Sequence, residues 1–152
     1  PEVLQSLLDA SAWLEPRDGS LFKSFNHGWA ADMLVDSGRI DEARVQAGRA
    51  LQQARRSDLL GAAMAARAMA VVAAQEQRFL RAERCLALAQ RVADRRQSPH
   101  ETAVNQWVGA VIARHAGRVA LARERLDRAL PAFERMGMRW HLAQGQALMV
   151  QL

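Results

Sequence analysis

The sequence contains no tyrosine, one cysteine, four prolines and only 5% aromatic residues. The single Cys85 excludes an internal disulfide, which is consistent with a reducing compartment, so we expect a cytoplasmic location. Few prolines, together with the absence of alternating β-branched runs, give no reason to expect a sheet. No apolar run reaches the roughly 18 residues that indicate a membrane-spanning helix, and no signal peptide or lipidation motif is visible. Because Ala and Leu dominate the apolar residues, the sequence predicts an all-α chain.

Residue sets that carry catalysis are also missing. His27, His100, His115 and His141 are spread along the chain and lack the spacing of metal ligands. The chain has no Ser-His-Asp or Cys-His set, no glycine-rich phosphate loop and no pair of carboxylates at informative spacing. We therefore expect no enzyme, no catalytic residues, no metal and no cofactor.

The chain is basic, with a net charge of +5, and 20 of its 21 cationic residues are Arg. Many of these alternate with acidic residues, which is typical of a solvated face of mixed charge: Arg44, Arg84, Arg123 and Arg125 interleave with Glu42, Glu83, Glu124 and Asp127. Arg55, Arg95 and Arg135 recur at expected helix ends, where a cation stabilises the negative end of the helix dipole. No basic segment interleaved with aromatics and no helix-turn-helix signature is visible, so nucleic-acid binding is the weaker hypothesis.

One segment occurs three times along the chain, at Gly38–Leu51, Gln77–Gln90 and Gly117–Leu130. In each copy a Gly-Arg or Gln-Arg pair precedes small or apolar residues at matching places. The spacing is 39 residues from Ala43 to Ala82 and 40 residues from Ala82 to Ala122. Self-similarity at such a period predicts a helical-repeat array, in which each unit buries its apolar face against its neighbours.

We expect one domain over residues 1–152. Its units are a leading helix (1–19), three repeats (20–56, 57–96 and 97–136) and an incomplete fourth repeat (137–152). The clearest helix start is at Pro99, with Ser98 as the cap and Glu101 placed to bond back to the Ser98 amide. Pro131 lies far inside an expected helix and predicts a bend just before it.

The three units resemble the tetratricopeptide pattern, in which three positions of each repeat hold small residues. All nine positions hold alanine here: Ala31, Ala43, Ala50, Ala70, Ala82, Ala89, Ala110, Ala122 and Ala129. The period exceeds the usual repeat of about 34 residues. Together with the Gly-Arg turn and the closing run Ala129–Gly137, it resembles the variant in MalT-like activators of the LuxR class and related bacterial signalling ATPases. This resemblance covers about residues 20–152 and implies a right-handed superhelix of about seven to eight helices.

In such arrays the first helix of each repeat lines a concave groove. The resemblance places these candidate binding residues there: Asp32, Asp36, Arg67, Gln75, Trp107, Arg114 and His115. Asp32 and Asp36 are like charges one helical turn apart, and either Arg67 or a basic group of a partner offsets their repulsion. Trp107 is either a core residue or an anchor for a ligand. His115 is most simply a cation or cap at a helix end.

This resemblance implies a non-catalytic scaffold that binds a protein, a peptide or a small effector as a module of a bacterial transcriptional or signalling regulator. One alternative is a free-standing adaptor or assembly protein with a peptide-binding groove, and a weaker one is an Arg-rich nucleic-acid-binding protein. The expected last helix, Met138–Leu152, is apolar on more than one face, whereas terminal repeats normally present a polar face. We therefore expect either a chain that continues past Leu152 or a homodimer formed through Trp140, Leu148 and Leu152.

Overall fold

The computed structural model describes residues 2–14, 16, 22–54 and 59–152, and these residues form eight α-helices and no strand. The helices are α1 (Glu2–Leu14), α2 (Lys23–Asp36), α3 (Ile40–Ala54), α4 (Leu59–Gln75), α5 (Phe79–Arg95), α6 (Pro99–His115), α7 (Val119–Arg135) and α8 (Arg139–Val150). The predicted all-α class is confirmed. None of these helices combines the length and the apolar character that crossing a membrane requires. Arg55, predicted to lie at a helix end, falls outside the described residues.

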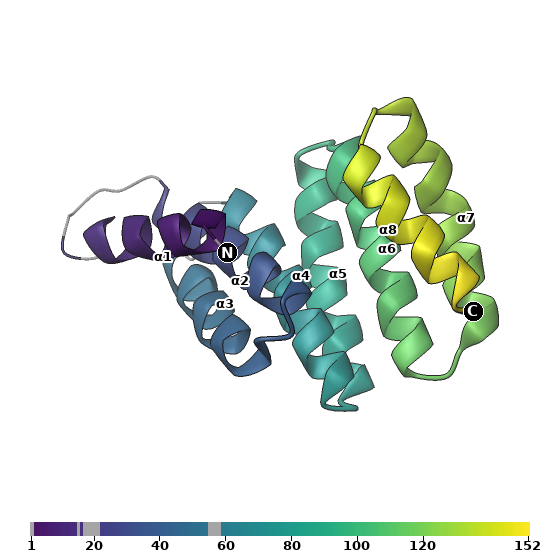
Figure 1. Cartoon of the computed structure of the whole chain (residues 1–152), viewed down its shortest axis with the longest axis horizontal. Coiled ribbons are helices and arrows are strands. Elements are labelled where there is room, and N and C mark those ends of the chain that lie inside the picture. Colours follow the sequence, from purple (N-terminus) through teal and green to yellow (C-terminus); the bar gives the residue numbers. More distant parts are fainter. Residues whose placement is uncertain (1, 15, 17–21, 55–58) are drawn as a thin grey trace.

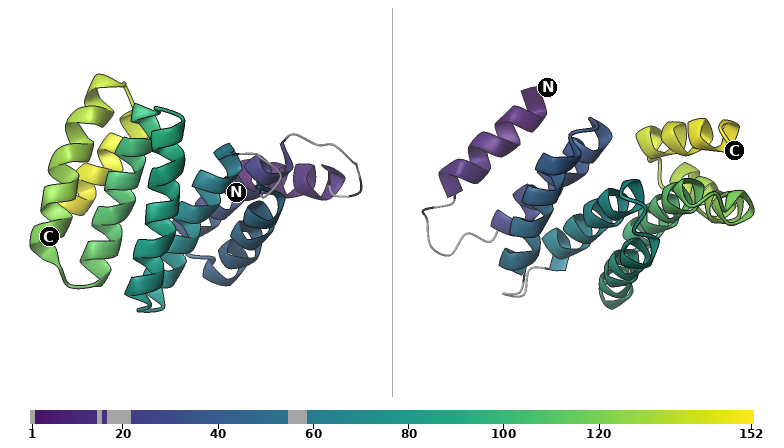
Figure 2. Two further views of the ribbon diagram at one scale, coloured as in Figure 1. Left: turned by 180° about the vertical axis from the view of Figure 1, so that it is seen from behind. Right: turned by 90° about the horizontal axis from the view of Figure 1, so that it is seen from below.

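Consecutive helices pack as antiparallel pairs, and the pairs stack along the long axis of the molecule from α1 to α8 (Figures 1 and 2). The first helices of the pairs also contact one another in succession, α2 with α4, α4 with α6 and α6 with α8. Between α3 and α5, and between α5 and α7, the backbones of the described residues make no such close contact. The helices therefore form a closely packed first-helix layer (α2, α4, α6 and α8) and a more open second-helix layer (α3, α5 and α7). This is the helical-repeat arrangement that the period predicts.

The short turns between helices share one geometry. The residue at the bend has a positive φ in each case: Gly38 (72°), Gln77 (59°), Gln97 (49°), Gly117 (69°) and Gly137 (66°). The amide that follows donates to a carbonyl five residues earlier, as from Arg39 to Leu34 at 2.9 Å, which satisfies the end of the helix. Two glutamines adopt a backbone conformation that suits glycine. Packing of the repeats therefore imposes this turn even where glycine is missing.

Helix α6 begins at Pro99 as predicted, and the Oγ of Ser98 accepts a hydrogen bond from the Glu101 amide at 3.3 Å. The predicted return bond from Glu101 to the Ser98 amide is wrong. That amide already donates to the Ala93 carbonyl at 3.0 Å, as part of the preceding turn. The Glu101 carboxylate instead forms an ion pair with Arg96 at 2.9 Å. The Ser98 side chain therefore caps α6 without a return bond from Glu101, and the Glu101 carboxylate pairs with Arg96 instead.

The nine repeat-pattern alanines are all buried, with 0% of their surface exposed. They lie where neighbouring helices cross, and the larger core side chains, including Leu34, Ile112, Leu126 and Phe133, fill the space around them. Helix α4 is buried over most of its circumference because α2, α3, α5 and α6 all pack against it. Its many small alanine side chains allow these neighbours to approach closely. Helix α7 runs through Pro131 as one element, and the bend there stays a prediction.

Replacing Ala89 with leucine should lower the free energy of unfolding by about 1–3 kcal/mol, because the added carbons overpack a fully buried crossing. Arg91→Ala is the matched control on the same helix: its side chain is exposed, so the change should stay within about 0.5 kcal/mol. Chemical denaturation of both variants measures the difference. Equal stability of the two would mean that α5 does not turn this face toward the core.

Candidate functional site

The first-helix layer holds the seven residues predicted to line a groove, but it does not bring them all together. Four of them are exposed at the C-terminal ends of α2, α4 and α6: Asp36, Gln75, Arg114 and His115. The other three, Asp32, Arg67 and Trp107, lie further inside these helices and contact residues of neighbouring helices. The predicted set therefore divides into separate places along the layer.

Arg67, in the middle of α4, is buried with only 5% of its surface exposed. Its Nη2 lies 4.0 Å from Asp32 Oδ2 on α2, and its Nη1 donates to Asn105 Oδ1 on α6 at 3.5 Å. The Nε atom is buried without a hydrogen-bond partner. Of the two alternatives for the acidic residues of α2, the structure shows pairing within the chain for Asp32. Arg67 joins three helices and does not face an open groove, so its predicted exposure to a ligand is wrong.

The protonation of Asp32 follows from this environment. Burial raises the pKa of Asp32 to about 7; the Arg67 guanidinium lowers it in part, and Asp36 adds to the rise. An unfolded aspartate releases its proton near pH 4. Between about pH 4 and pH 7, Asp32 therefore holds a proton in the folded chain that it has lost in the unfolded chain. The stability contributed by this group is therefore complete below pH 4 and is lost as the pH rises to about 7.

Asp32→Asn should raise the free energy of unfolding by about 1–3 kcal/mol at pH 8, because a neutral amide replaces a poorly solvated carboxylate. At pH 4 wild-type Asp32 is itself protonated in the fold, so the difference should nearly vanish. Urea denaturation at the two pH values measures both effects. Asp127→Asn, at an exposed position of α7, is the control and should change stability little at either pH. A stabilisation by Asp32→Asn that is equal at pH 4 and pH 8 would contradict this assignment.

Trp107 belongs to an aromatic cluster at the C-terminal end of the first-helix layer, formed with Trp140 and His141 of α8. The ring centroids lie 6.0 Å apart for Trp107 and Trp140 and 5.9 Å apart for Trp107 and His141, both edge to face. This is the favourable arrangement of aromatic pairs. Trp107 is partly buried, whereas Trp140 is 50% exposed. Trp107 thus packs within the chain, and Trp140 extends the aromatic surface to solvent.

Sequence reasoning missed His141, which lies at the centre of this cluster. Its ring is 4.9 Å from Trp140 and 5.2 Å from Phe133 of α7, measured between centroids. Desolvation lowers the pKa of His141 to about 4, and the positive potential of His100 and Arg67 adds to the effect. The imidazole is therefore neutral in the fold above about pH 5. Within the described part of the chain, no three His, Cys, Asp or Glu side chains are placed to hold a metal ion.

The three residues predicted to form a self-association surface do not share one face of α8. Leu148 is buried, with 7% exposed, and packs against Ala110, Ala122 and Leu126, and Leu152 packs partly on the same cluster. The prediction that Leu148 adds to an exposed surface is wrong, because α8 turns this side onto α6 and α7. Trp140 and Val150, at 50% and 88% exposed, are the large apolar side chains that α8 leaves uncovered. Self-association through them stays a prediction.

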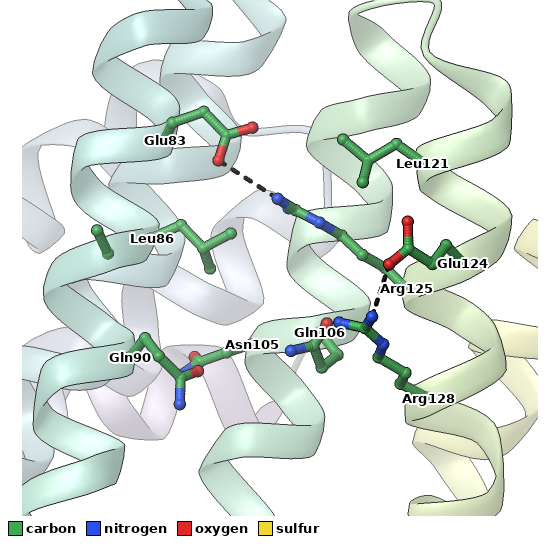
Figure 3. Close-up of a pocket in the computed structure, with 10 residues that line it drawn as sticks. Glu83, Leu86, Gln90, Asn105, Gln106, Leu121, Glu124, Arg125 and Arg128 are labelled. Carbon is green, nitrogen blue, oxygen red and sulfur yellow. Dashed lines mark hydrogen bonds and ion pairs between the residues drawn. The ribbon is translucent and has the colours of Figure 1, made fainter.

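A cleft lies in the second-helix layer, between α5 and α7 (Figure 3). Because the backbones of these two helices make no close contact in the described residues, α6 forms the floor between two walls. The cleft has a volume of about 320 Å³ and is lined largely by polar and charged side chains: Glu83, Leu86, Ala87, Gln90, Asn105, Gln106, Leu121, Glu124, Arg125 and Arg128. Its position follows from the open spacing of the second-helix layer.

The charges of this cleft are partly paired. Glu83 lies 3.5 Å from Arg125, and Glu124 pairs with Arg128 at 2.6 Å (Figure 3). Glu83 also lies 3.9 Å from Arg118. On the floor, the Asn105 amide donates to Gln90 Oε1 at 3.1 Å. The Nη1 atom of Arg125 is buried and has no hydrogen-bond partner. Sequence reasoning placed Glu83 and Arg125 on a solvated face of mixed charge and therefore missed the cleft.

Comparison with known proteins finds no matching family model, no matching curated protein and no matching solved structure. The repeat period and the paired helices are consistent with a helical-repeat fold, and they indicate the fold alone. A repeat fold of this kind does not by itself imply a function, which depends on the sites it carries.

Proposed function

We propose that this chain is a non-catalytic helical-repeat scaffold that binds a protein or peptide partner through its first-helix layer. The observation that supports this most directly is the half-exposed Trp140, held by Trp107 and His141. Tryptophan residues dominate the binding energy of many interfaces, and a ring fixed in advance loses little conformational entropy on binding. An apolar side chain of the partner packs on Trp140 in this proposal.

The finer proposal is that the scaffold serves as an interaction or effector-sensing module of a bacterial transcriptional or signalling regulator. Its support is the sequence resemblance to MalT-like proteins, carried by the repeat alanines, the Gly-Arg turn and the closing run Ala129–Gly137. A free-standing adaptor that uses the same face is the alternative. Both versions require the same partner site, so one experiment addresses the shared part.

A protein partner is favoured over nucleic acid by the state of the arginines. Several of them form ion pairs within the chain, such as Arg39 with Glu42 at 2.6 Å and Arg128 with Glu124 at 2.6 Å. Affinity for nucleic acid depends on cations that neutralise phosphates and release counterions. Arginines already paired with carboxylates contribute less to such binding, despite the net charge of +5.

Selection of a random peptide library displayed on phage against the intact chain tests the proposal. A selected peptide should bind the wild-type chain and bind Trp140→Ala at least about tenfold more weakly, because loss of an interface tryptophan typically costs 2 kcal/mol or more. Fluorescence anisotropy of the labelled synthetic peptide gives both affinities. Circular dichroism of the variant checks that the helices remain folded.

Val45→Ala is the matched control, because Val45 is 54% exposed on α3 in the other layer. It should leave the affinity for the selected peptide unchanged. Peptides that bind wild type and Trp140→Ala equally well would exclude the aromatic cluster as the site. Failure of the library to yield any saturable binder would count against a peptide-binding function of this face.

A further inference from the structure

The guanidinium of Arg125 occupies a space that only glycine leaves open. The side chain reaches from α7 across α6 toward Glu83 on α5 (Figure 3). A Cβ at Gly109 on α6 would lie 2.1 Å from Arg125 Nη1 and 2.9 Å from its Cζ. Any larger residue at Gly109 would therefore displace the guanidinium. The position of the Arg125 guanidinium depends on a second residue, so it is a built feature of the cleft.

The preceding repeat shows that the fold does not need this arrangement. Forty residues earlier in each case, Met69 stands in place of Gly109 and Cys85 in place of Arg125. Met69 belongs to a buried apolar cluster between α2, α3 and α4, and Cys85 packs against that cluster. Replacing buried ion pairs with well-packed apolar residues is often neutral or stabilising. Stability of the repeat therefore does not explain the arginine and the glycine at this junction.

The charges of the cleft leave one positive charge in excess. Glu83 is shared by Arg118 and Arg125, while Glu124 and Arg128 form a pair of their own. The Nη1 atom of Arg125 is buried against Gly109 without a hydrogen-bond partner, so a ligand in the cleft meets the rest of the guanidinium, on a side chain that is 19% exposed. A singly charged carboxylate matches this excess, and a guanidinium binds it with strong charge-assisted hydrogen bonds. A phosphate dianion would carry one charge too many beside the two carboxylates.

Amide side chains surround this charge on the floor and one wall. Gln106 presents both a donor and an acceptor, which suits a neutral amide of a ligand, whereas Gln90 and Asn105 bond to each other and to Asp94 and Arg67. The volume of about 320 Å³ is at the small end of ligand clefts. We propose that the cleft between α5, α6 and α7 binds a carboxylate that stands next to an amide, as in an N-acylated amino acid or an acidic residue of a peptide. This site is independent of the partner site on the first-helix layer.

Titration of the ¹⁵N-labelled chain with N-acetyl-L-alanine, followed by NMR, tests the proposal. The Gly109 backbone amide and the Asn105 and Gln106 side-chain amides should shift in a saturable manner. N-acetyl-L-alaninamide, which differs only in its neutral end, should produce no saturable shift, because Arg125 then has no charge to bind. Acetyl-Gly-Asp-Gly-amide is the second probe, and its tighter binding would identify an acidic side chain of a protein as the source of the carboxylate. Tighter binding of N-acetyl-L-alanine would identify a free α-carboxylate.

Arg125→Met removes the charge and keeps much of the apolar length of the side chain. We expect its affinity for N-acetyl-L-alanine to fall by about tenfold or more. Arg123→Met, at an exposed position of the same helix, is the matched control and should bind as wild type does. Equal binding by Arg125→Met and wild type would overturn the proposal. If Arg125→Met does not fold, the wild-type chain still provides a test. Equal NMR shifts with N-acetyl-L-alanine and with N-acetyl-L-alaninamide would overturn the proposal.

Discussion

Replacing Gly61 with alanine is expected to lower the free energy of unfolding by about 3 kcal/mol, at the upper end of the usual cost of overpacking. An alanine Cβ at this position of α4 would lie 2.3 Å from the carbonyl carbon of Ser24 and 2.5 Å from its oxygen. Both atoms belong to the backbone of α2, so no change of side-chain rotamer relieves the clash. Helix α2 has to move away from α4, and contacts along the whole crossing are weakened.

Gly48→Ala is the matched control, because Gly48 is exposed inside α3 and no atom would lie within 4 Å of an added Cβ. There alanine should raise the free energy of unfolding by about 0.4–1 kcal/mol, since it restricts the unfolded chain without strain. Urea denaturation gives both values, with an unchanged dependence on denaturant as the check on two-state behaviour. A Gly61→Ala variant as stable as Gly48→Ala would show that α2 and α4 do not approach as closely as described.

The fold was predictable because periodicity fixes which face of each helix is buried. A period of 39 or 40 residues puts the nine alanines at equivalent places, and all nine have 0% exposed. The requirement for glycine at position 61 could not be predicted, because in an Ala-rich helix a glycine follows the same pattern as any other small residue. Its distinct role depends on the backbone of Ser24 across the crossing, which no local pattern encodes.

The candidate sites were predictable only where one helix supplies the signal. The repulsion of Asp32 and Asp36, one turn apart, indicated the need for a cation, and Arg67 pairs with Asp32. The cleft between α5 and α7 left no such signal. Glu83 and Arg125 are 42 positions apart and alternate with other charges, so each has the pattern of a solvated residue. Their meeting depends on the open spacing of the second-helix layer over α6.

The two groups with the largest pKa shifts act on stability in opposite directions. Asp32, with its pKa raised to about 7, loses its stabilising contribution as the pH rises from about 4 to 7. His141, with its pKa lowered to about 4, contributes fully above pH 6.5 and loses that contribution as the pH falls to about 4. The contributions of these two groups therefore oppose each other over this range. Loss of either group would expose the pH dependence of the other.

Phe133→Ala should lower the free energy of unfolding by about 3–5 kcal/mol, the usual cost of emptying a buried phenylalanine site. Phe133 has 0% of its surface exposed and is the largest fully buried side chain among the described residues. It belongs to the core cluster that joins α4 to α7, with Ala82 and Ile112 among its members. Alanine would leave a cavity there, because the rigid helices around it cannot close in fully. Thermal and urea denaturation measure the loss.

The same substitution has a second expected result at His141, whose ring lies 5.2 Å from that of Phe133. Desolvation is the largest cause of the lowered pKa of His141, so water that enters beside the imidazole should raise this pKa from about 4 toward 6.5. An NMR titration of the histidine ring protons at a temperature where the variant is folded measures this change. Leu80→Ala on α5, where the side chain is 69% exposed, should change stability by less than about 0.5 kcal/mol and leave His141 unaffected. If Phe133→Ala costs no more than Leu80→Ala and His141 titrates as before, α7 and α8 do not enclose the phenylalanine and the histidine together.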